Sequence, residues 1–329
     1  MKKLINRTED VLAESLAGFA AAHADIVTLG EGGRFVRRAA SKPGKVALIS
    51  GGGSGHEPLH AGFVGHGMLD AACPGQVFTS PTPDQMLAAA EAVDTGAGTL
   101  FIVKNYEGDV MNFDMAAEMA PGPTARVLVD DDVAVERSTW STGRRGVAGT
   151  MVVEKILGAA AEAGMALDGL ATLGASVNAR TRSMGVALTS CVVPAAGTPT
   201  FTLAEDEMEM GVGIHGEPGR RRVKLASANA IAEEMLGAIL GDLAPPKGAP
   251  CLLLVNGFGG TPLMELYLLY HAARTMAEAK GLLVARSLVG NHVTSLEMAG
   301  GSITLAMLDE ADLARWDAPV HTAALRWGA

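Results

Sequence analysis

A buried strand that breaks into a glycine-rich loop is the feature that most constrains this chain. Residues 46–58 read Val-Ala-Leu-Ile-Ser-Gly-Gly-Gly-Ser-Gly-His-Glu-Pro, an aliphatic run followed by four glycines. Such a run bounded by turn residues predicts a buried strand that feeds a loop. Glycines allow tight turns and let a ligand approach main-chain N–H groups. We therefore expect His56 at the carboxyl end of a strand, where open α/β sheets bind ligands, with a solvated histidine in a tight turn as the alternative.

Two further strand–loop–helix units repeat this pattern. Residues 99–119 predict a strand, a loop at residues 104–109 and a helix from residue 110. Residues 251–280 predict the same order, with the loop at residues 256–262. Other strands are predicted at residues 126–129, 185–193, 282–287 and 302–308, and another helix at residues 226–240. The alternation indicates an α/β fold in which helices flank parallel or mixed sheets.

The length of the chain indicates more than one domain. Single cores stop growing at about 250–300 residues, and this chain has 329 residues. Its composition, 48% hydrophobic and 19% charged, provides enough apolar side chains for large cores. A polar stretch at residues 178–183 precedes a new apolar run. We therefore place the boundary there, which gives an N-terminal α/β domain at residues 1–182 and a C-terminal α/β domain at residues 183–329.

Charge, cysteine content and hydropathy exclude several classes of protein. The net charge of −10 argues against nucleic-acid binding, which needs clustered Lys and Arg. Cys73, Cys191 and Cys251 are scattered and form no C-x-x-C pair, which indicates reduced thiols. The N-terminus lacks the apolar core of a signal peptide, and the sequence has no apolar run long enough to span a bilayer. We expect a cytoplasmic protein without membrane contact.

Glycine-rich loops carry the side chains that could do chemistry. The sequence has no G-x-x-x-x-G-K-[ST] loop, no kinase glycine-loop set, no G-x-S-x-G and no spacing that requires a metal. The remaining candidates are His56, Lys104, Asp109 and His215, which all lie in glycine-rich turns. A neutral imidazole can act as a general base or as a nucleophile toward a carbonyl. The histidines expected to have structural roles are His23, His60, His66, His271, His292 and His321.

The second histidine loop resembles a nucleotide motif only in part. Residues 211–216 match G-x-G-x-x-G, but Pro218 and Gly219 break the helix that should bind the pyrophosphate. We therefore reject a dinucleotide site. What remains is His215 between glycines, in a His-Gly-Glu-Pro sequence that echoes the Gly-His-Glu-Pro sequence around His56.

Two groups of charged residues each have two interpretations. Asp130, Asp131 and Asp132 follow a predicted strand; a metal site is one interpretation, and we favour a solvated strand end. Arg144 and Arg145 precede an apolar-periodic helix, and their charges oppose the helix dipole. We expect both arginines to face an anion or an acidic partner, with an ordinary surface pair as the alternative.

Five motifs occur in order along the chain. They are Gly-Gly-Gly-Ser-Gly-His-Glu-Pro at residues 51–58, Lys-Asn-Tyr-Glu-Gly-Asp at 104–109, Gly-Arg-Arg-Gly at 143–146, Gly-Ile-His-Gly-Glu-Pro-Gly at 213–219 and Asn-Gly-Phe-Gly-Gly-Thr at 256–261. Together they resemble the dihydroxyacetone-binding subunit family of dihydroxyacetone kinases. The resemblance covers essentially the whole chain, and it implies two α/β domains with the substrate held in loops at strand ends near the domain interface.

The resemblance also implies a role for each loop. In the family, the histidine that matches His215 bonds through a ring nitrogen to the ketone carbon, which gives a hemiaminal. Such a bond selects ketones and aldehydes over polyols, and it orients the terminal hydroxyl for phosphoryl transfer. The residues implied in binding the substrate hydroxyls are Gly53, Ser54, Gly55, His56, Lys104 and Asp109. His56 and Asp109 share the removal of the hydroxyl proton, and the sequence leaves open which of them accepts it.

The resemblance further implies partners. Family members that work as one polypeptide carry an additional helical nucleotide domain after this region, so we expect ADP or ATP with Mg²⁺ on a separate subunit and no cofactor on this chain. The phosphoryl donor is either a phosphotransferase-system protein or exchanged ATP. Arg144 and Arg145 are the residues expected to face that subunit. The family also implies a homodimer and a place in glycerol metabolism.

Three alternatives stay open. The same covalent chemistry suits erythrulose or another short ketose. A non-catalytic, ketose-sensing regulatory paralogue would keep the covalent histidine, although His56 and Asp109 beside His215 argue against it. From the residues alone, an aldolase or isomerase that acts through a carbonyl is the other enzyme class.

Overall fold

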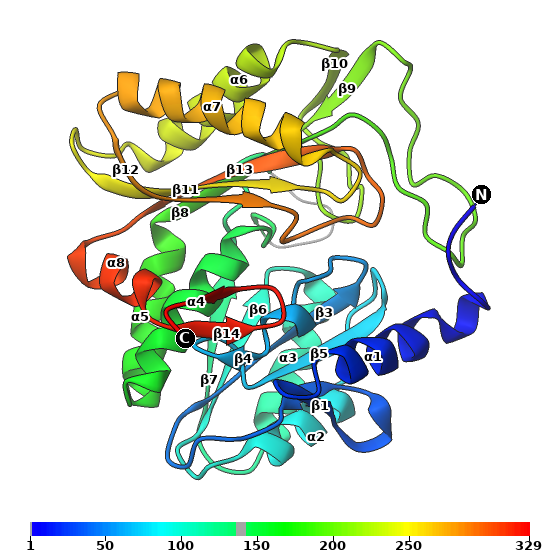
Figure 1. The fold of residues 1–329 in the computed structure, drawn as a ribbon, viewed down its shortest axis with the longest axis vertical. Helices are drawn as coiled ribbons and strands as arrows, with labels where there is room; N and C mark the ends of the chain where they lie inside the picture. The colour runs from blue at the N-terminus through cyan, green and yellow to red at the C-terminus, as the bar shows by residue number, and fades with distance from the viewer. Residues whose placement is uncertain (1, 136–142) are drawn as a thin grey trace. The chain divides into compact units, whose positions relative to one another are not determined.

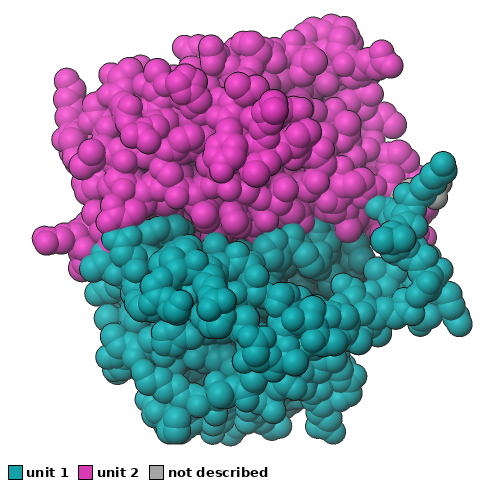
Figure 2. All heavy atoms as spheres, in the orientation of Figure 1, with its two compact units in different colours: residues 1–128, 153–176, 314–329 teal, residues 129–152, 177–313 magenta. Residues whose placement is uncertain are grey.

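The computed structural model describes residues 2–135 and 143–329 (Figure 1). The chain forms two compact units, coloured separately in Figure 2. Unit 1 comprises Met1–Leu128, Val153–Ser176 and Ala314–Ala329, and unit 2 comprises Val129–Val152 and Val177–Leu313. The helices that contribute residues to both units are α4 (Gly149–Glu162), α5 (Leu167–Ala179) and α8 (Glu310–Asp317). The single boundary between residues 182 and 183 stays a prediction, since these units are each assembled from separate segments.

Unit 1 contains a mixed sheet in the order β1-β2-β5-β3-β6-β7. Its strands are β1 (Val27–Leu29), β2 (Val36–Arg38), β3 (Ala47–Ser54), β5 (Ala71–Val77), β6 (Thr99–Lys104) and β7 (Thr124–Val129). β3 lies in the middle and pairs in parallel with both β5 and β6. Every residue of β3 is buried, as the aliphatic run predicted. The predicted strands at residues 99–103 and 126–129 are confirmed as β6 and β7.

Helices and a small second sheet complete unit 1. The helical segments are η1 (Thr8–Asp10), α1 (Val11–Ala22), η2 (Glu31–Gly33), η3 (Ala61–Phe63), α2 (Pro83–Val93) and α3 (Glu107–Met119). α2 and α3 pack on the main sheet, where the rings of Phe101 and Phe113 lie edge to face with centroids 5.6 Å apart. The second sheet consists of β4 (Gly65–His66), β14 (Val320–Thr322) and β15 (Arg326–Trp327). It joins the C-terminal segment to the region that follows the glycine loop.

Unit 2 contains a mixed sheet in the order β10-β9-β8-β13-β11-β12. Its strands are β8 (Thr181–Ala187), β9 (Glu207–Met210), β10 (Arg221–Lys224), β11 (Pro250–Gly257), β12 (Leu283–Gly290) and β13 (Gly300–Met307). β11 and β12 are parallel, and β13 runs antiparallel to β11. The helices α6 (Ala228–Leu243) and α7 (Leu263–Ala279) lie side by side over this sheet (Figure 1) and share its apolar core.

The sequence located most elements of unit 2 correctly. The strands near residues 282–287 and 302–308 and the helices near 226–240 and 263–280 are confirmed. The strand predicted at residues 185–193 is wrong in its bounds, because β8 begins at Thr181 within the polar stretch and ends at Ala187. Polar residues fit this strand because Ser183 is buried and its hydroxyl pairs with the Thr304 hydroxyl at 2.7 Å.

Among the described residues, no helix combines the length and the apolar character needed to cross a bilayer.

Candidate functional site

The glycine loop after β3 is fixed by its own contacts. β3 continues through the glycines to Ser54, whose hydroxyl donates to a carbonyl of β5 at 2.7 Å. The N–H of Gly55 donates to both carboxylate oxygens of Glu57, at 3.1 and 3.0 Å. His56 is fully buried and stacks on Phe78, with ring centroids 5.1 Å apart. The predicted place of His56 at the carboxyl end of a strand is confirmed, and the solvated alternative is wrong because the ring is buried.

Lys104 and Asp109 lie beside the end of β3. Lys104 is the last residue of β6, and its ammonium donates to the Gly51 carbonyl at 3.2 Å and lies 3.6 Å from Asp109 Oδ2. Asp109 is in the first turn of α3, which begins at Glu107 rather than at the predicted residue 110. Gly52 provides the space for this pair, because a Cβ there would overlap the Lys104 ammonium. Both charged side chains are buried, so their attraction is weakly screened.

His60, for which the sequence indicated a structural role, contacts Lys104. Its Nε2 lies 3.0 Å from Lys104 Nζ, and its Nδ1 lies 2.7 Å from Glu154 Oε1 and 3.0 Å from the Ser50 hydroxyl. Burial and the charges of Lys104 and His56 hold the pKa of His60 well below its ordinary value. Sequence reasoning missed His60 and Glu154 as functional residues. The proximity of His60 to His56 in the loop was a usable signal, whereas Glu154 lies in the distant helix α4 and had none.

His215 lies in the loop between β9 and β10 of unit 2. Its Nδ1 is 2.8 Å from Glu217 Oε1, and its backbone N–H donates to Glu217 Oε2 at 3.0 Å. A carboxylate only accepts hydrogen bonds, so the neutral ring carries its proton on Nδ1 and has its lone pair on Nε2. The segment leads into β10 rather than a helix, so the G-x-G-x-x-G match lacks the helix N-terminus that pyrophosphate binding uses.

Opposite charge surrounds the carboxylate of Glu217. Burial raises its pKa, but the protonated form of the His215 ring and the Arg145 guanidinium outweigh burial and lower the pKa to about 2. Gly213 is needed beside this cluster, because a Cβ there would overlap the Glu217 carboxylate. Glu217 is therefore ionised at neutral pH and orients the His215 ring. Sequence reasoning missed the role of Glu217, although its position two residues after His215 in the same motif was a local signal.

The interpretation of Arg145 as a partner-facing residue is wrong. Its side chain is buried, and its guanidinium donates to Asp132 Oδ2 at 2.9 Å and to the Gly211 carbonyl at 2.8 Å. A buried guanidinium needs such acceptors, so its charge is used inside unit 2 to support the His215 loop. Arg144 differs, because it forms a partly exposed ion pair with Asp242. Its role toward a partner stays a prediction.

The interpretation of the three aspartates as a solvated strand end is also wrong for two of them. Asp131 is fully buried and accepts from the N–H groups of Val147 and Gly149, at 2.8 and 2.7 Å, and from the Ser183 hydroxyl. It therefore satisfies donors at the start of α4. Burial raises the pKa of Asp131 to about 6, against the effect of these hydrogen bonds. Asp132 is buried with Arg145.

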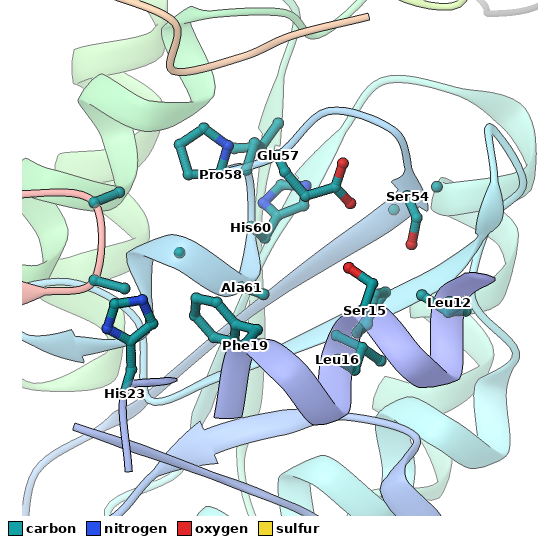
Figure 3. A pocket seen from close by; sticks show the side chains of 17 residues that line it. Leu12, Ser15, Leu16, Phe19, His23, Ser54, Glu57, Pro58, His60 and Ala61 are labelled. Atoms are coloured by element: carbon teal, nitrogen blue, oxygen red, sulfur yellow. The ribbon is translucent and has the colours of Figure 1, made fainter. Parts of the chain in front are cut away.

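A cavity of about 420 Å³ lies against the glycine loop of unit 1 (Figure 3). α1 contributes Ser15, Leu16 and Phe19 to one wall, while Glu57 and His60 contribute to the other. Small-molecule sites have volumes of roughly 300–1,000 Å³ and mainly apolar walls with a few polar groups. The cavity therefore provides space for a small ligand beside the glycine loop.

The residues implicated by the sequence divide between the two units. Unit 1 holds Gly53, Ser54, Gly55, His56, Lys104 and Asp109, and unit 2 holds His215, Arg144 and Arg145. Within unit 1 the structure brings Lys104 and Asp109 together at the end of β3. Across residues 2–135 and 143–329, no cluster of three or more His, Cys, Asp or Glu side chains is arranged to bind a metal ion.

Comparisons with known proteins agree with this arrangement of motifs. A family model described as the Dak1 domain matches residues 17–324. The Escherichia coli (strain K12) protein named PEP-dependent dihydroxyacetone kinase, dihydroxyacetone-binding subunit DhaK, is 48% identical over 100% of both chains. The solved structure titled dihydroxyacetone kinase operon co-activator Dha-DhaQ has a TM-score of 0.90 and 36% identity, covering 95% of this chain and 97% of its own.

A solved kinase also shares the fold. The dihydroxyacetone kinase from C. freundii in complex with AMP-PNP and Mg²⁺ has a TM-score of 0.86 and 33% identity, covering 99% of this chain and 61% of its own. The α/β fold class and the family resemblance of the five motifs are thus confirmed. The chain belongs to the Dak1 domain family, the family of the dihydroxyacetone-binding subunits of dihydroxyacetone kinases.

Proposed function

We propose that this chain is the dihydroxyacetone-binding subunit of a dihydroxyacetone kinase, a phosphotransferase with an alcohol as acceptor. The E. coli relative bears that name and matches along its whole length. The proposal assigns the ketone carbon to His215, and the ketose hydroxyls to residues 53–56 with Lys104 and Asp109. The observation that supports it best is the contact between His215 Nδ1 and Glu217, because it directs the lone pair of the ring to Nε2.

The covalent step uses the His215 ring and the Glu217 carboxylate. The Nε2 lone pair of His215 forms a bond to the ketone carbon, and the C=O electron pair moves to the oxygen, which takes up a proton from solvent. The ring keeps its Nδ1 proton and becomes cationic. Glu217, which is ionised at neutral pH, stabilises this cation. Glycerol has no carbonyl and cannot form the bond.

The phosphoryl transfer requires a second component. We propose that the terminal hydroxyl of the bound ketose attacks a phosphoryl group of ATP, held with Mg²⁺ on a separate nucleotide-binding subunit, while His56 or Asp109 takes the hydroxyl proton. The C. freundii kinase, whose chain is longer, was solved with AMP-PNP and Mg²⁺. The relatives from Listeria innocua and Lactococcus lactis are named PTS-dependent, which favours recharging of the nucleotide by the phosphotransferase system.

Three further assignments belong to this proposal. Arg144 faces the nucleotide-binding subunit, the active form is a homodimer, and the protein works in the cytoplasm. The last assignment is supported by Cys73, Cys191 and Cys251, which are unpaired thiols buried in the protein. The homodimer rests on the family resemblance alone.

A regulatory function is the second candidate, because the co-activator has a TM-score of 0.90 to this chain. A ketose sensor needs binding without transfer, so it has no use for a base beside the hydroxyl. Beside Lys104 at the end of β3, Asp109 is a buried carboxylate that can take a hydroxyl proton. This carboxylate favours the kinase, and erythrulose or another short ketose remains an alternative substrate.

The decisive experiment follows the ketone carbon itself. Dihydroxyacetone labelled with ¹³C at the ketone carbon should lose its sp² carbonyl resonance and gain an sp³ resonance when it binds the protein. His215→Ala should abolish the sp³ resonance while the fold is kept, and labelled glycerol should show no new resonance. An unchanged carbonyl resonance for bound ketose would refute the hemiaminal. Phosphorylation assays with dihydroxyacetone and erythrulose, with the nucleotide-binding subunit supplied, then separate kinase from sensor.

A further inference from the structure

The ammonium group of Lys104 is fully buried in unit 1, and its three N–H donors each need an acceptor. Two of these N–H groups have acceptors, the Gly51 carbonyl at 3.2 Å and His60 Nε2 at 3.0 Å. The nearest further acceptor is Asp109 Oδ2, at 3.6 Å. This distance exceeds a normal hydrogen bond, so one N–H points toward Asp109 without being consumed by it.

These contacts determine the tautomer of His60. An ammonium group can only donate, so His60 Nε2 must accept and its ring proton must lie on Nδ1. Nδ1 has the matching acceptors, Glu154 Oε1 at 2.7 Å and the Ser50 oxygen at 3.0 Å. Ser50 is able to accept because its own hydroxyl proton goes to the Ile102 carbonyl, at 2.7 Å. One placement of the protons therefore satisfies the whole chain of contacts from Lys104 to Glu154.

Resting on the proposed function, we infer that His60 and Glu154 are positioning residues for phosphoryl transfer. Glu154 holds the His60 proton on Nδ1, and His60 Nε2 then holds the Lys104 ammonium so that its remaining N–H faces Asp109 and the ketose hydroxyl. If the ring proton moved to Nε2, it would oppose the ammonium and displace Lys104 from this direction. Neither residue touches the reacting atoms in this scheme, and both act through Lys104.

The arrangement costs stability, which argues that it is more than core packing. Glu154 is fully buried, and within the described part of the chain its Oε2 has no hydrogen-bond partner. An unsatisfied buried oxygen destabilises the folded state, because it has lost its hydrogen bonds to water. Burial raises the pKa of Glu154 to about 8, against the effects of Ser50 and Lys104, and a proton carried on Oε2 still leaves Oε1 to accept from His60. An apolar residue at this position would avoid both costs, since replacing buried charged groups by apolar residues is often neutral or stabilising.

The tautomer can be measured without any assay of activity. The full chain is labelled with ¹⁵N at its histidines, and long-range ¹H–¹⁵N correlation spectra are recorded from about pH 6 to about pH 8. The His60→Gln variant identifies the His60 signals by their loss. The ionisable groups around the His60 ring are His56, Lys104, Asp109 and Glu154. We expect the ring to stay neutral and protonated on Nδ1 across this range, because burial and the charges of Lys104 and His56 lower its pKa. A ring protonated on Nε2, or one that becomes cationic in this range, would overturn the inference.

Kinetics then test whether the contact matters for transfer. His60→Leu removes the acceptor for Lys104, whereas the side-chain oxygen of His60→Gln can replace Nε2 as an acceptor. With the nucleotide-binding subunit supplied, kcat should fall about 10- to 100-fold in His60→Leu, the usual cost of losing a supporting hydrogen bond, and recover at least partly in His60→Gln. At saturating ketose, the ¹³C hemiaminal should still form in both variants, which separates transfer from the covalent step.

The outcomes of these assays are distinguishable. If the wild-type protein is active and His60→Leu keeps the same kcat, the inference is contradicted and the proposed function is not. An equal loss of kcat in His60→Leu and His60→Gln has the same meaning. A wild-type protein that forms no hemiaminal or phosphorylates no ketose contradicts the proposed function, and the tautomer measurement then decides the inference by itself. Because that measurement uses the wild-type chain, it holds even if His60→Leu does not fold.

Discussion

Replacing Glu217 by Gln should expose how tightly the His215 loop depends on one buried charge. The Glu217 carboxylate accepts from the His215 ring at 2.8 Å and from the His215 backbone N–H at 3.0 Å, and Arg145 adds a second positive charge nearby. Glu217→Gln keeps the shape and one carbonyl acceptor but removes the charge. The expected result is a loop that still forms but is less stable, with a weaker hold on the His215 ring.

The magnitude follows from the pKa of Glu217. A fall from 4.5 to about 2 is worth about 3 kcal/mol of folding free energy, at about 1.36 kcal/mol for each pKa unit. Because the pKa is lower in the folded state, this contribution is complete well above pH 4.5 and is lost as the pH falls toward 2. Glu217→Gln should therefore lower the free energy of unfolding by up to about 3 kcal/mol at about pH 5, and by less than half of that at about pH 3.

Urea unfolding at the two pH values is the assay, with Glu205→Gln as the matched control. Glu205 is an exposed glutamate twelve residues before Glu217 in the same unit, so its replacement should change neither value. The ¹³C ketose experiment on Glu217→Gln adds a functional readout, and we expect weaker hemiaminal formation. A deficit that is equal at both pH values, or none at the higher pH, would refute the argument that opposite charge around Glu217 sets the stability of this loop.

Two further predictions follow from the two units. His56→Asn and Asp109→Asn should keep the hemiaminal and lower turnover about 10²- to 10⁴-fold, the usual cost of losing a general base, and unchanged turnover in both would make them spectators. Arg145→Ala should lower the free energy of unfolding by about 3–5 kcal/mol in a urea titration, because it leaves Asp132 buried without its cation. Arg145→Lys keeps the charge and should lose less, so an equal loss in both variants would contradict the role of the ion pair.

The strand-to-loop pattern could be predicted because it depends on local sequence. Aliphatic runs before glycines located β3, β6 and β11, and parallel pairing of β3 with β6 then brought their carboxyl ends together. That is why Lys104 and the glycines of β3 meet, as the family resemblance implied when it assigned both to the substrate. The start of α3 was misplaced by three residues, because the glycine at residue 108 was taken for part of the loop when it lies inside the first turn.

The buried charges could not be predicted in the same way. Asp131, Asp132 and Arg145 were assigned to the surface because charged residues are rarely fully buried unless they are paired. Some of their partners lie far away in sequence: Ser183 is 52 residues from Asp131, and Gly211 is 66 residues from Arg145. Asp132 and Arg145 pair across 13 residues, but no local periodicity links these two positions. Local composition contains no information about such pairs, so the exposed interpretation was the reasonable one and was wrong.

The two histidines that matter most show where this limit lies. His215 and His60 are both held through Nδ1 by a carboxylate, at 2.8 and 2.7 Å, so both present Nε2 on the opposite edge of the ring. For His215 the carboxylate is two residues away, and a histidine followed by a nearby glutamate in a glycine loop was available as a signal. For His60 it is 94 residues away, on α4, and only the fold brings it close. The same arrangement was therefore predictable in one loop and not in the other, because the first is built by the local chain and the second by the contact of Glu154 on α4 with His60.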